Sequence, residues 1–155
     1  MKLVIVDDDI LLCSALSRNL IRSGHAARRA TSVETALRLI ESENPSAVLT
    51  DLEMGPGGTG IELIVRLRAA GSSVPVLMMT GSDPKTARER LRAAELHEIA
   101  ILEKPFEFEE LMTRLASVFP EVSALQPSVS PGSQAPRTPM AAMMNVVRSF
   151  GGRVM

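Results

Sequence analysis

Four polar segments of this chain each follow shortly after an apolar run. Runs of this length are typical of buried parallel β-strands. The carboxyl ends of parallel strands meet at one edge of a sheet, and ligands bind at that edge in open α/β sheets. We therefore expect the four segments to form one site. In chain order they are Asp7-Asp8-Asp9, Asp51, Thr80 and Lys104.

The side chains of these segments supply three kinds of chemistry. Crowded carboxylates repel one another unless a hard cation lies among them, and oxygen ligands of this kind suit Mg²⁺. A hydroxyl and an ammonium group can bind the oxygens of an anion. Together they predict phosphoryl transfer, because charge on the phosphoryl oxygens must be neutralised. The carboxylate of Asp51 could itself be the nucleophile, which would give an aspartyl phosphate.

Taken singly, each of these residues also has an ordinary structural explanation. An aspartate after a strand commonly caps the next helix or stabilises a turn. Thr80 could be a strand-end threonine whose hydroxyl is bonded locally, and Lys104 could be a solvated lysine. Their placement at one predicted sheet edge favours the site over four separate explanations.

The elements that must position these residues alternate along the chain. Apolar runs at 2–6, 25–30, 47–51, 74–79 and 99–102 predict strands, and amphipathic segments between and after them predict helices. Five strand–helix units within about 119 residues imply an α/β fold, with a parallel sheet covered on both faces by right-handed crossovers. Helix starts are predicted at Asp9, Thr31-x-x-Glu34, Thr59-x-x-Glu62 and Asp83-Pro84.

Composition and charge exclude several classes of partner. With 17 basic and 18 acidic residues, the net charge of −1 argues against a whole-surface attraction to nucleic acid or to an anionic membrane. Cys13 is the only cysteine, so no internal disulfide is possible and a reducing compartment is expected. No secretory signal precedes the first strand and no apolar run approaches 18 residues. We expect a cytoplasmic protein.

The amino-acid composition changes after Phe119. Residues 120–139 contain five of the ten prolines and several serines, which predicts an extended linker. Residues 140–155 are small and apolar, and they could form a partner-binding helix or the start of a truncated output region. Three arginines against one glutamate after Phe119 are too few charges for a DNA-reading module, so direct nucleic-acid binding is not expected.

The ordered set of motifs resembles the receiver domain of bacterial two-component response regulators, the CheY-like superfamily. The resemblance covers about residues 1–119 and implies a flavodoxin-like, doubly wound, five-stranded (βα)₅ fold. The motifs that carry it are Val6-Asp7-Asp8, Leu49-Thr50-Asp51-Leu52-Glu53-Met54, Met79-Thr80-Gly81 and Lys104-Pro105-Phe106.

The resemblance also implies a role for each site residue. Asp51 would be the phosphoacceptor, and Lys104 would pair with the phosphoryl oxygens. Thr80 would be the switch hydroxyl that moves toward the phosphoryl group. Mg²⁺ would be held by the carboxylates of Asp7, Asp8 and Asp51 and by the backbone carbonyl of Glu53.

By the same resemblance, the partners would be a sensor histidine kinase or phosphotransfer protein and a downstream protein. A homodimer could form on phosphorylation, and no membrane association is expected. The protein would assist its own aspartyl phosphorylation and dephosphorylation without being a metabolic enzyme.

Three features depart from the usual receiver pattern. The segment from Gly55 to Gly60 carries one extra residue after Met54. Ile101 occupies the position where receivers often have an aromatic side chain that rotates on activation. Glu53 places a carboxylate two residues after Asp51, where it could bias the attack of water on the acyl phosphate.

Three other interpretations remain open. The chain could be the N-terminal fragment of a longer response regulator, with a transcriptional or other output. It could be a receiver-fold interaction module that works without phosphorylation; the complete set of site residues argues against this, whereas Ile101 leaves it open. It could be an aspartate-nucleophile phosphohydrolase, but those enzymes typically carry a second aspartate where this chain has Glu53, and the chain has no cap domain.

Overall fold

The computed structural model describes residues 1–119 of the chain. Residues 1–104 form one compact unit, and a second unit begins at Pro105. The first unit contains five strands and helices α1 to α4, and helix α5 belongs to the second. The linker predicted at 120–139 and the tail predicted at 140–155 lie outside the described residues.

The five strands form one sheet in the order β2-β1-β3-β4-β5, and every neighbouring pair is parallel. Strand order reverses at β1, which places the topological switch point between β1 and β3. This arrangement confirms the flavodoxin-like doubly wound sheet. The strands are β1 (Lys2–Val6), β2 (Ala26–Ala30), β3 (Ala47–Asp51), β4 (Val76–Thr80) and β5 (Ala100–Glu103).

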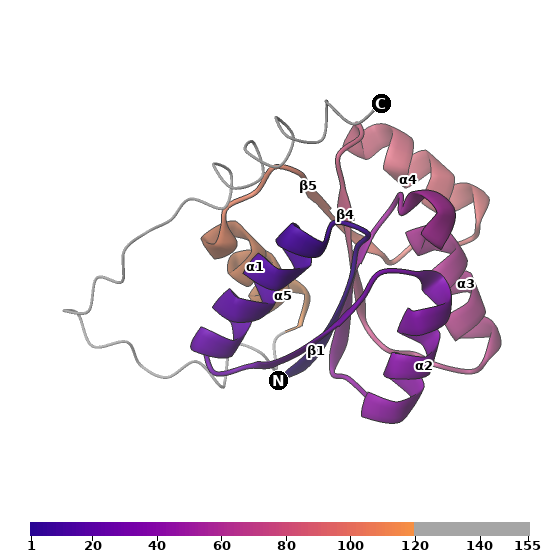
Figure 1. Ribbon diagram of the computed structural model, residues 1–155. Coiled ribbons are helices and arrows are strands. Elements are labelled where there is room, and N and C mark those ends of the chain that lie inside the picture. The colour runs from indigo at the N-terminus through magenta and orange to yellow at the C-terminus, as the bar shows by residue number, and fades with distance from the viewer. Residues whose placement is uncertain (120–155) are drawn as a thin grey trace, which may run out of the picture. The chain divides into compact units, whose positions relative to one another are not determined.

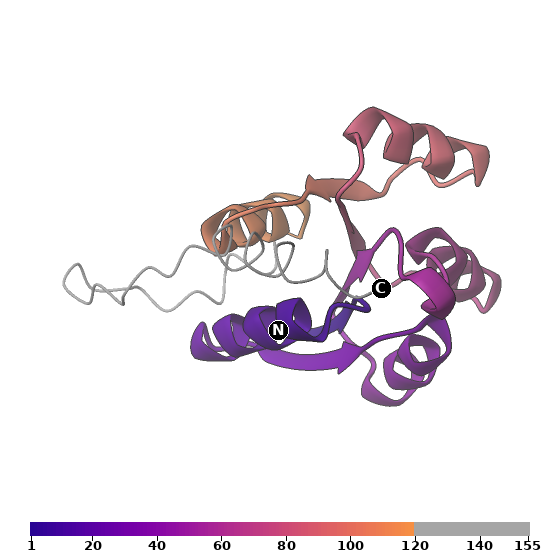
Figure 2. The same ribbon diagram turned by 45° about the horizontal axis from the view of Figure 1, so that its top comes forward.

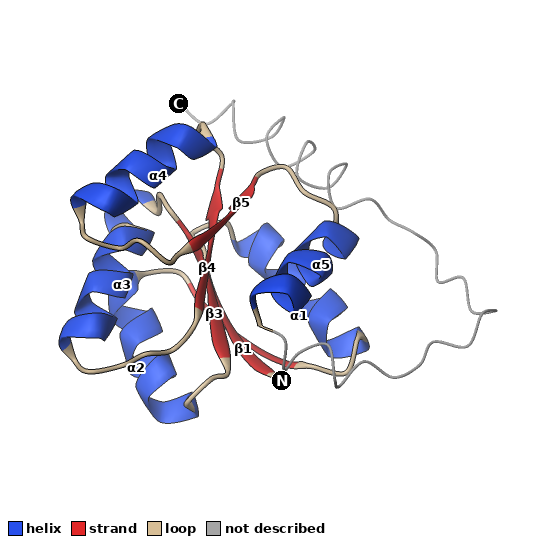
Figure 3. Ribbon diagram, turned by 180° about the vertical axis from the view of Figure 1, so that it is seen from behind, coloured by secondary structure: helices blue, strands red, loops and turns tan. Residues whose placement is uncertain are grey.

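Helices of the first unit cover both faces of this sheet. Helix α1 lies on one face, against β1 and β2, whereas α2, α3 and α4 lie on the other (Figures 1 and 2). The view from behind shows the same division (Figure 3). The helices are α1 (Ile10–Arg22), α2 (Val33–Glu43), α3 (Gly60–Ala69) and α4 (Pro84–Ala93).

The core of the first unit is aliphatic, as expected from a chain with four phenylalanines, no tryptophan and no tyrosine. Strands β3 and β4 are buried at every position, which is why their sequences read as almost continuous apolar runs. On the face with α2 and α3, Val4, Val48 and Met78 belong to one cluster with Ala36 and Leu63. This rigid sheet fixes the strand ends that carry the polar segments.

Side-chain caps begin four helices, three of them where the sequence predicts. Asp9 accepts a hydrogen bond from the backbone N–H of Leu12, Thr59 accepts one from Glu62, and Asp83 accepts one from Lys85. The prediction that Thr31 caps α2 is wrong by one residue. Ser32 is the cap instead, because its Oγ accepts the N–H of Thr35.

Other boundaries move by a few residues for local reasons. Strand β2 begins at Ala26 and lies at an edge of the sheet, so Arg28 and Arg29 face solvent and interrupt its apolar pattern. Strand β4 begins at Val76, after Pro75, which has no N–H to donate to the sheet. Residues Gly55–Gly57 form a 3₁₀ turn that the sequence did not predict.

Helix α5 (Phe108–Val118) is the described element of the second unit. Its apolar residues recur at helical spacing, and Leu111 and Leu115 are buried. Among the helices of residues 1–119, none combines the length and the apolar character that a membrane crossing requires.

Candidate functional site

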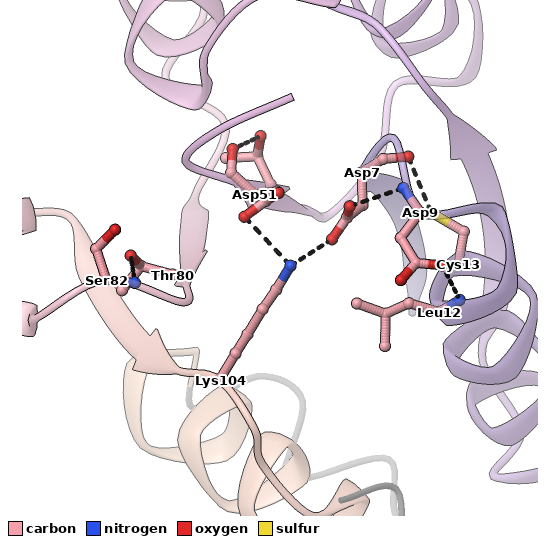
Figure 4. A network of polar contacts seen from close by, with 9 residues as sticks. Asp7, Asp9, Leu12, Cys13, Asp51, Thr80, Ser82 and Lys104 are labelled. Carbon is pink, nitrogen blue, oxygen red and sulfur yellow. Dashed lines mark hydrogen bonds and ion pairs between the residues drawn. The ribbon is translucent and has the colours of Figure 1, made fainter. Parts of the chain in front are cut away.

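The polar segments predicted from the sequence meet at the carboxyl ends of the strands. Asp7 follows β1, Asp51 ends β3, and these two strands flank the switch point of the sheet. Thr80 ends β4, and Lys104 follows β5. Figure 4 shows the Lys104 side chain extending toward Asp7 and Asp51, with Thr80 beyond Asp51 on the opposite side from Asp7.

Lys104 joins the two buried carboxylates. Its Nζ lies 2.7 Å from Oδ2 of Asp7 and 3.2 Å from Oδ1 of Asp51. The backbone N–H of Lys104 donates to the carbonyl of Thr80 over 2.7 Å, so the residue is anchored to the end of β4. The ammonium therefore lies between two carboxylates that would otherwise repel each other at short range.

Electrostatics at the site are dominated by burial. Burial raises the pKa of Asp7 to about 6; the positive charge of Lys104 opposes this shift and the negative charge of Asp51 adds to it. The pKa of Asp51 is also raised by burial, again against the effect of Lys104. Burial would lower the pKa of Lys104, but the charges of Asp7 and Asp51 outweigh it, so that pKa is raised. The site carries more negative than positive charge, which favours a further cation.

Three carboxylates could hold that cation. One oxygen atom from each of Asp7, Asp8 and Asp51 lies within 4.8 Å of the other two. Asp7 and Asp51 are buried whereas Asp8 is exposed, so the group is open to solvent on the Asp8 side. An all-oxygen ligand set with an open side fits Mg²⁺, which keeps several of its waters when it binds to proteins.

Several backbone contacts orient these carboxylates. The backbone N–H of Asp9 donates to Oδ1 of Asp7 over 3.0 Å, which leaves Oδ2 to Lys104. The thiol of Cys13 donates to the carbonyl of Asp7 over 3.4 Å. Burial raises the pKa of this thiol to about 12, so Cys13 is a buried structural residue.

Thr80 lies at the site but is not bonded to its carboxylates. The residue is 1% exposed, and its Oγ1 accepts a hydrogen bond from the backbone N–H of Ser82 over 3.0 Å. Within residues 1–119, no hydrogen bond joins Thr80 to Asp51. The Ser82 bond uses a lone pair of the hydroxyl, so its proton can be donated elsewhere.

The Glu53 carboxylate is not part of the group formed by Asp7, Asp8 and Asp51. The side chain of Glu53 instead forms an ion pair with Arg90 of α4. The role of its backbone carbonyl as a metal ligand stays a prediction.

The segment after Met54, where the sequence predicts an extra residue, forms a closed loop. The backbone of Glu53 forms an antiparallel bridge with Thr59, and the N–H of Met54 donates to the carbonyl of Gly58. Gly57 packs so closely on the preceding turn that a Cβ there would lie 2.8 Å from the carbonyl oxygen of Thr31. The two ends of the loop are therefore bonded to each other, and Gly57 packs against the turn that precedes α2.

Sequence reasoning missed one residue that shapes the site. A Cβ at Gly60 would lie 2.4 Å from the carbonyl oxygen of Asp51, so α3 can start this close to the end of β3 only with glycine there. The N–H of Gly60 also donates to the carbonyl of Leu52. A glycine directly after the Thr59 cap was the available signal, but only the folded chain shows what it touches.

Ile101 lies in the core. It is 8% exposed, pairs with Met78 across β4 and β5, and belongs to the aliphatic cluster on the face that α2 and α3 cover. Where receivers often carry an aromatic side chain, this chain therefore has an isoleucine that is part of the hydrophobic core.

Known proteins resemble this chain in sequence and in fold. Residues 3–116 match the family model of the response regulator receiver domain. The chain is similar to the response regulator MprA of Mycolicibacterium vanbaalenii, with 33% identity over 117 residues that cover 76% of this chain and 49% of that protein. The chain thus spans about half the length of the curated relatives it matches.

Two solved structures agree with this match. The chemotaxis response regulator CheY4 of Vibrio cholerae is 26% identical with a TM-score of 0.67, and the match covers 76% of this chain and 97% of that one. A DNA-binding response regulator of the LuxR family from Staphylococcus aureus is 26% identical with a TM-score of 0.66 and the same coverage. Because the family model matches residues 3–116 and the fold agrees with it, the chain belongs to the response regulator receiver domain family of two-component systems.

Proposed function

We propose that Asp51 accepts a phosphoryl group from the phosphohistidine of a sensor histidine kinase or phosphotransfer protein. One observation carries the proposal. The Lys104 ammonium contacts the carboxylates of Asp7 and Asp51 at the point where these two and Asp8 bring oxygen atoms within 4.8 Å of one another. This arrangement concentrates a nucleophile, an anion-binding cation and a metal ligand set at one sheet edge.

In the transfer step, an oxygen of Asp51 attacks the phosphorus of the phosphohistidine. An O–P bond forms, the P–N bond breaks, and its electron pair returns to the imidazole nitrogen of the donor. The nucleophile must be ionised, and the Lys104 charge opposes the rise in the pKa of Asp51 that burial causes. Lys104 is then positioned to pair with an oxygen of the transferred group.

Carboxylates of Asp7, Asp8 and Asp51, with the backbone carbonyl of Glu53, would hold Mg²⁺ at this site. The ion would supply positive charge that neutralises the phosphoryl oxygens. The crowding of carboxylates supports this assignment, because burial and the charge of Asp51 raise the pKa of Asp7 and a bound cation would relieve both effects.

Thr80 would act as the switch. Phosphorylation adds a charge of about −1.5 to −2 beside a buried hydroxyl whose proton is not used in its bond to Ser82. Donation of that proton to the phosphoryl group would draw Thr80 toward Asp51. The turn from Gly81 to Asp83, which leads into α4, would follow and shift a two-state equilibrium.

Output would pass through protein contacts. Receiver domains are signalling modules and not metabolic enzymes. We propose that phosphorylation changes the binding of a downstream protein partner or leads to a homodimer, and that the protein acts in the cytoplasm. The relative from Staphylococcus aureus is a DNA-binding response regulator. An output of that kind would lie in further sequence of a longer chain.

The decisive experiment is an intact-mass measurement after incubation with acetyl phosphate and Mg²⁺. We expect one phosphoryl adduct that hydroxylamine removes and that is lost in Asp51→Asn. Absence of an adduct in the native protein would contradict the proposal and favour a module that works without phosphorylation. Steady hydrolysis of many phosphate esters would instead favour the phosphohydrolase.

A further inference from the structure

Glu53 and Arg90 form an ion pair between residues 37 positions apart in the chain. Glu53 lies two residues after Asp51, and Arg90 lies in the last turn of α4. The side chains are 54% and 40% exposed, respectively. The contact thus joins the segment after Asp51 to helix α4. Within residues 1–104, the side chains of the other site residues form no hydrogen bond with α4.

The Glu53 end of this contact is tightly connected to Asp51. The N–H of Leu52 donates to the carbonyl of Met79 over 2.9 Å, and Leu52 is 1% exposed. Glu53 is bridged to Thr59 on its other side, and the following Met54 is fully buried. The backbone between Asp51 and Glu53 has little freedom to absorb a displacement, so a change at Asp51 reaches the Glu53 side chain.

The Arg90 end lies on a weakly anchored helix. Only Ala87 and Leu91 of α4 are buried, and the other eight residues of this helix are partly or fully exposed. Besides its N-cap, α4 is held by a hydrogen bond from the Arg88 guanidinium to the carbonyl of Ile99 over 2.9 Å. Apart from the burial of Ala87 and Leu91, the ion pair with Glu53 is thus one of few side-chain contacts that hold this helix to the rest of the first unit. Its loss should be felt in local opening of α4 more than in global stability.

We propose that the ion pair between Glu53 and Arg90 couples the Asp51 site to α4, which makes Arg90 a positioning residue for phosphorylation. This inference rests on the proposed function of Asp51. A phosphoryl group places new negative charge two residues from Glu53 and competes with it for the Arg90 guanidinium. The competition weakens the ion pair and releases α4, and by linkage the state of α4 changes how easily Asp51 is modified.

The test is amide hydrogen exchange of residues 84–93, with the intact mass of each sample recorded. In the metal-free, unmodified protein we expect Arg90→Gln and Glu53→Gln each to speed exchange of these amides about twofold to fivefold. The double variant should exchange no faster than either single variant, because both remove the same contact. Arg90→Lys, which keeps the charge, should restore most of the protection.

Acetyl phosphate with Mg²⁺ supplies the second comparison. Exchange of residues 84–93 in the native protein should rise on phosphorylation toward the level of unmodified Arg90→Gln. Phosphorylated Arg90→Gln should show little further change. A merely structural ion pair would not make the response to phosphorylation depend on Arg90.

Glu34 and Arg66 supply a matched control. Their ion pair joins α2 to α3 with an N–O distance of 2.5 Å and comparable exposure, 65% and 43%. Arg66→Gln should leave the exchange of residues 84–93 unchanged, both before and after phosphorylation. Equal effects of Arg66→Gln and Arg90→Gln on these amides would overturn the proposal.

Failure of the coupling and failure of the proposed function give different results. Unchanged exchange in Arg90→Gln, or additive effects in the double variant, would overturn the coupling while the phosphoryl adduct still forms. If no adduct forms in the native protein, the mass measurement shows that the proposed function itself has failed and that the coupling fails with it.

Discussion

The ammonium of Lys104 lies 2.7 Å from the carboxylate of Asp7, although 97 positions separate the two residues in the chain. Asp7 is 1% exposed, so its negative charge is almost entirely removed from water. The same ammonium reaches Asp51. One cation therefore serves two buried carboxylates, and the stability and the chemistry of the site depend on the same atom.

Replacement of Lys104 by methionine should destabilise the metal-free protein. Two buried carboxylates would lose their shared cation, and breaking a buried ion pair on one side costs about 3–5 kcal/mol. Because the Lys104 side chain is 13% exposed, we expect the lower end of that range. Urea unfolding at pH 7.5 measures the loss.

Lys2→Met is the matched control for that variant. Its ammonium lies 3.2 Å from Glu43 in a pair of which the lysine side chain is 43% exposed. Exposed pairs contribute less than about 1 kcal/mol. A loss in Lys104→Met no larger than in Lys2→Met would contradict the role assigned to the buried ammonium.

Asp7→Asn should stabilise the metal-free protein above pH 6. The folded-state pKa of Asp7 is raised from 3.8 to about 6, so the folded protein binds the proton more tightly than the unfolded chain does. Below pH 3.8 both states are protonated and ionisation of Asp7 has no effect on stability. As pH rises through 6, ionisation of the buried carboxyl comes to cost about 3 kcal/mol at most.

Unfolding free energies between pH 4 and pH 8 test this sign. The advantage of Asp7→Asn over the native protein should be about 1–3 kcal/mol near pH 7.5 and should shrink toward pH 4. An advantage that is constant across this range would show that relief of ionisation is not the cause.

Mg²⁺ should raise the stability of the native protein more at pH 7.5 than at pH 5. A metal ion competes with protons for Asp7, whose pKa is raised to about 6. At a concentration ten times its dissociation constant, an ion that binds only the folded state adds about 1.4 kcal/mol. Thermal unfolding with Mg²⁺ and with EDTA gives the difference.

Asp8→Asn is the variant suited to check the metal prediction, because Asp8 is exposed and its replacement should leave the fold intact. Its stabilisation by Mg²⁺ should be strongly reduced. Undiminished stabilisation in this variant would place the bound ion elsewhere.

Gly60→Ala should displace the backbone of Asp51, although Gly60 has no polar side chain of its own. The added methyl group would lie 2.4 Å from the carbonyl oxygen of Asp51, so either α3 or the end of β3 must move. We expect a loss of about 1–3 kcal/mol, typical of overpacking, and slower phosphorylation by acetyl phosphate. Urea unfolding and the time course of the intact mass measure the two effects.

Gly71→Ala is the control that separates the effect of a steric contact with the site from the effect of backbone strain on stability. Gly71 has a φ of +83°, and a Cβ added there would have no other atom within 4 Å, so alanine costs conformational strain alone. This variant should lose stability with an unchanged phosphorylation rate. A normal rate in Gly60→Ala would show that the close approach to Asp51 does not matter for the chemistry.

Local patterns in the sequence determined the order of the elements and the polar residues that follow the strands. Apolar runs and caps are local properties, because a strand or a helix start depends on residues a few positions apart. Three of four predicted caps are confirmed, and the exception, Ser32 in place of Thr31, is an error of one position between two hydroxyl residues. The parallel sheet follows from the alternation of these elements.

Only the tertiary structure decided which of these residues touch and how burial changes their charge. The raised pKa of Asp7 depends on how deeply the first strand is covered and on where Lys104 arrives from the fifth. The pairing of Glu53 with Arg90 depends on where α4 is placed, and the approach of Gly60 to Asp51 depends on how α3 packs on the end of β3. Such contacts depend on how whole elements pack against one another, and no local pattern in the sequence encodes their distances.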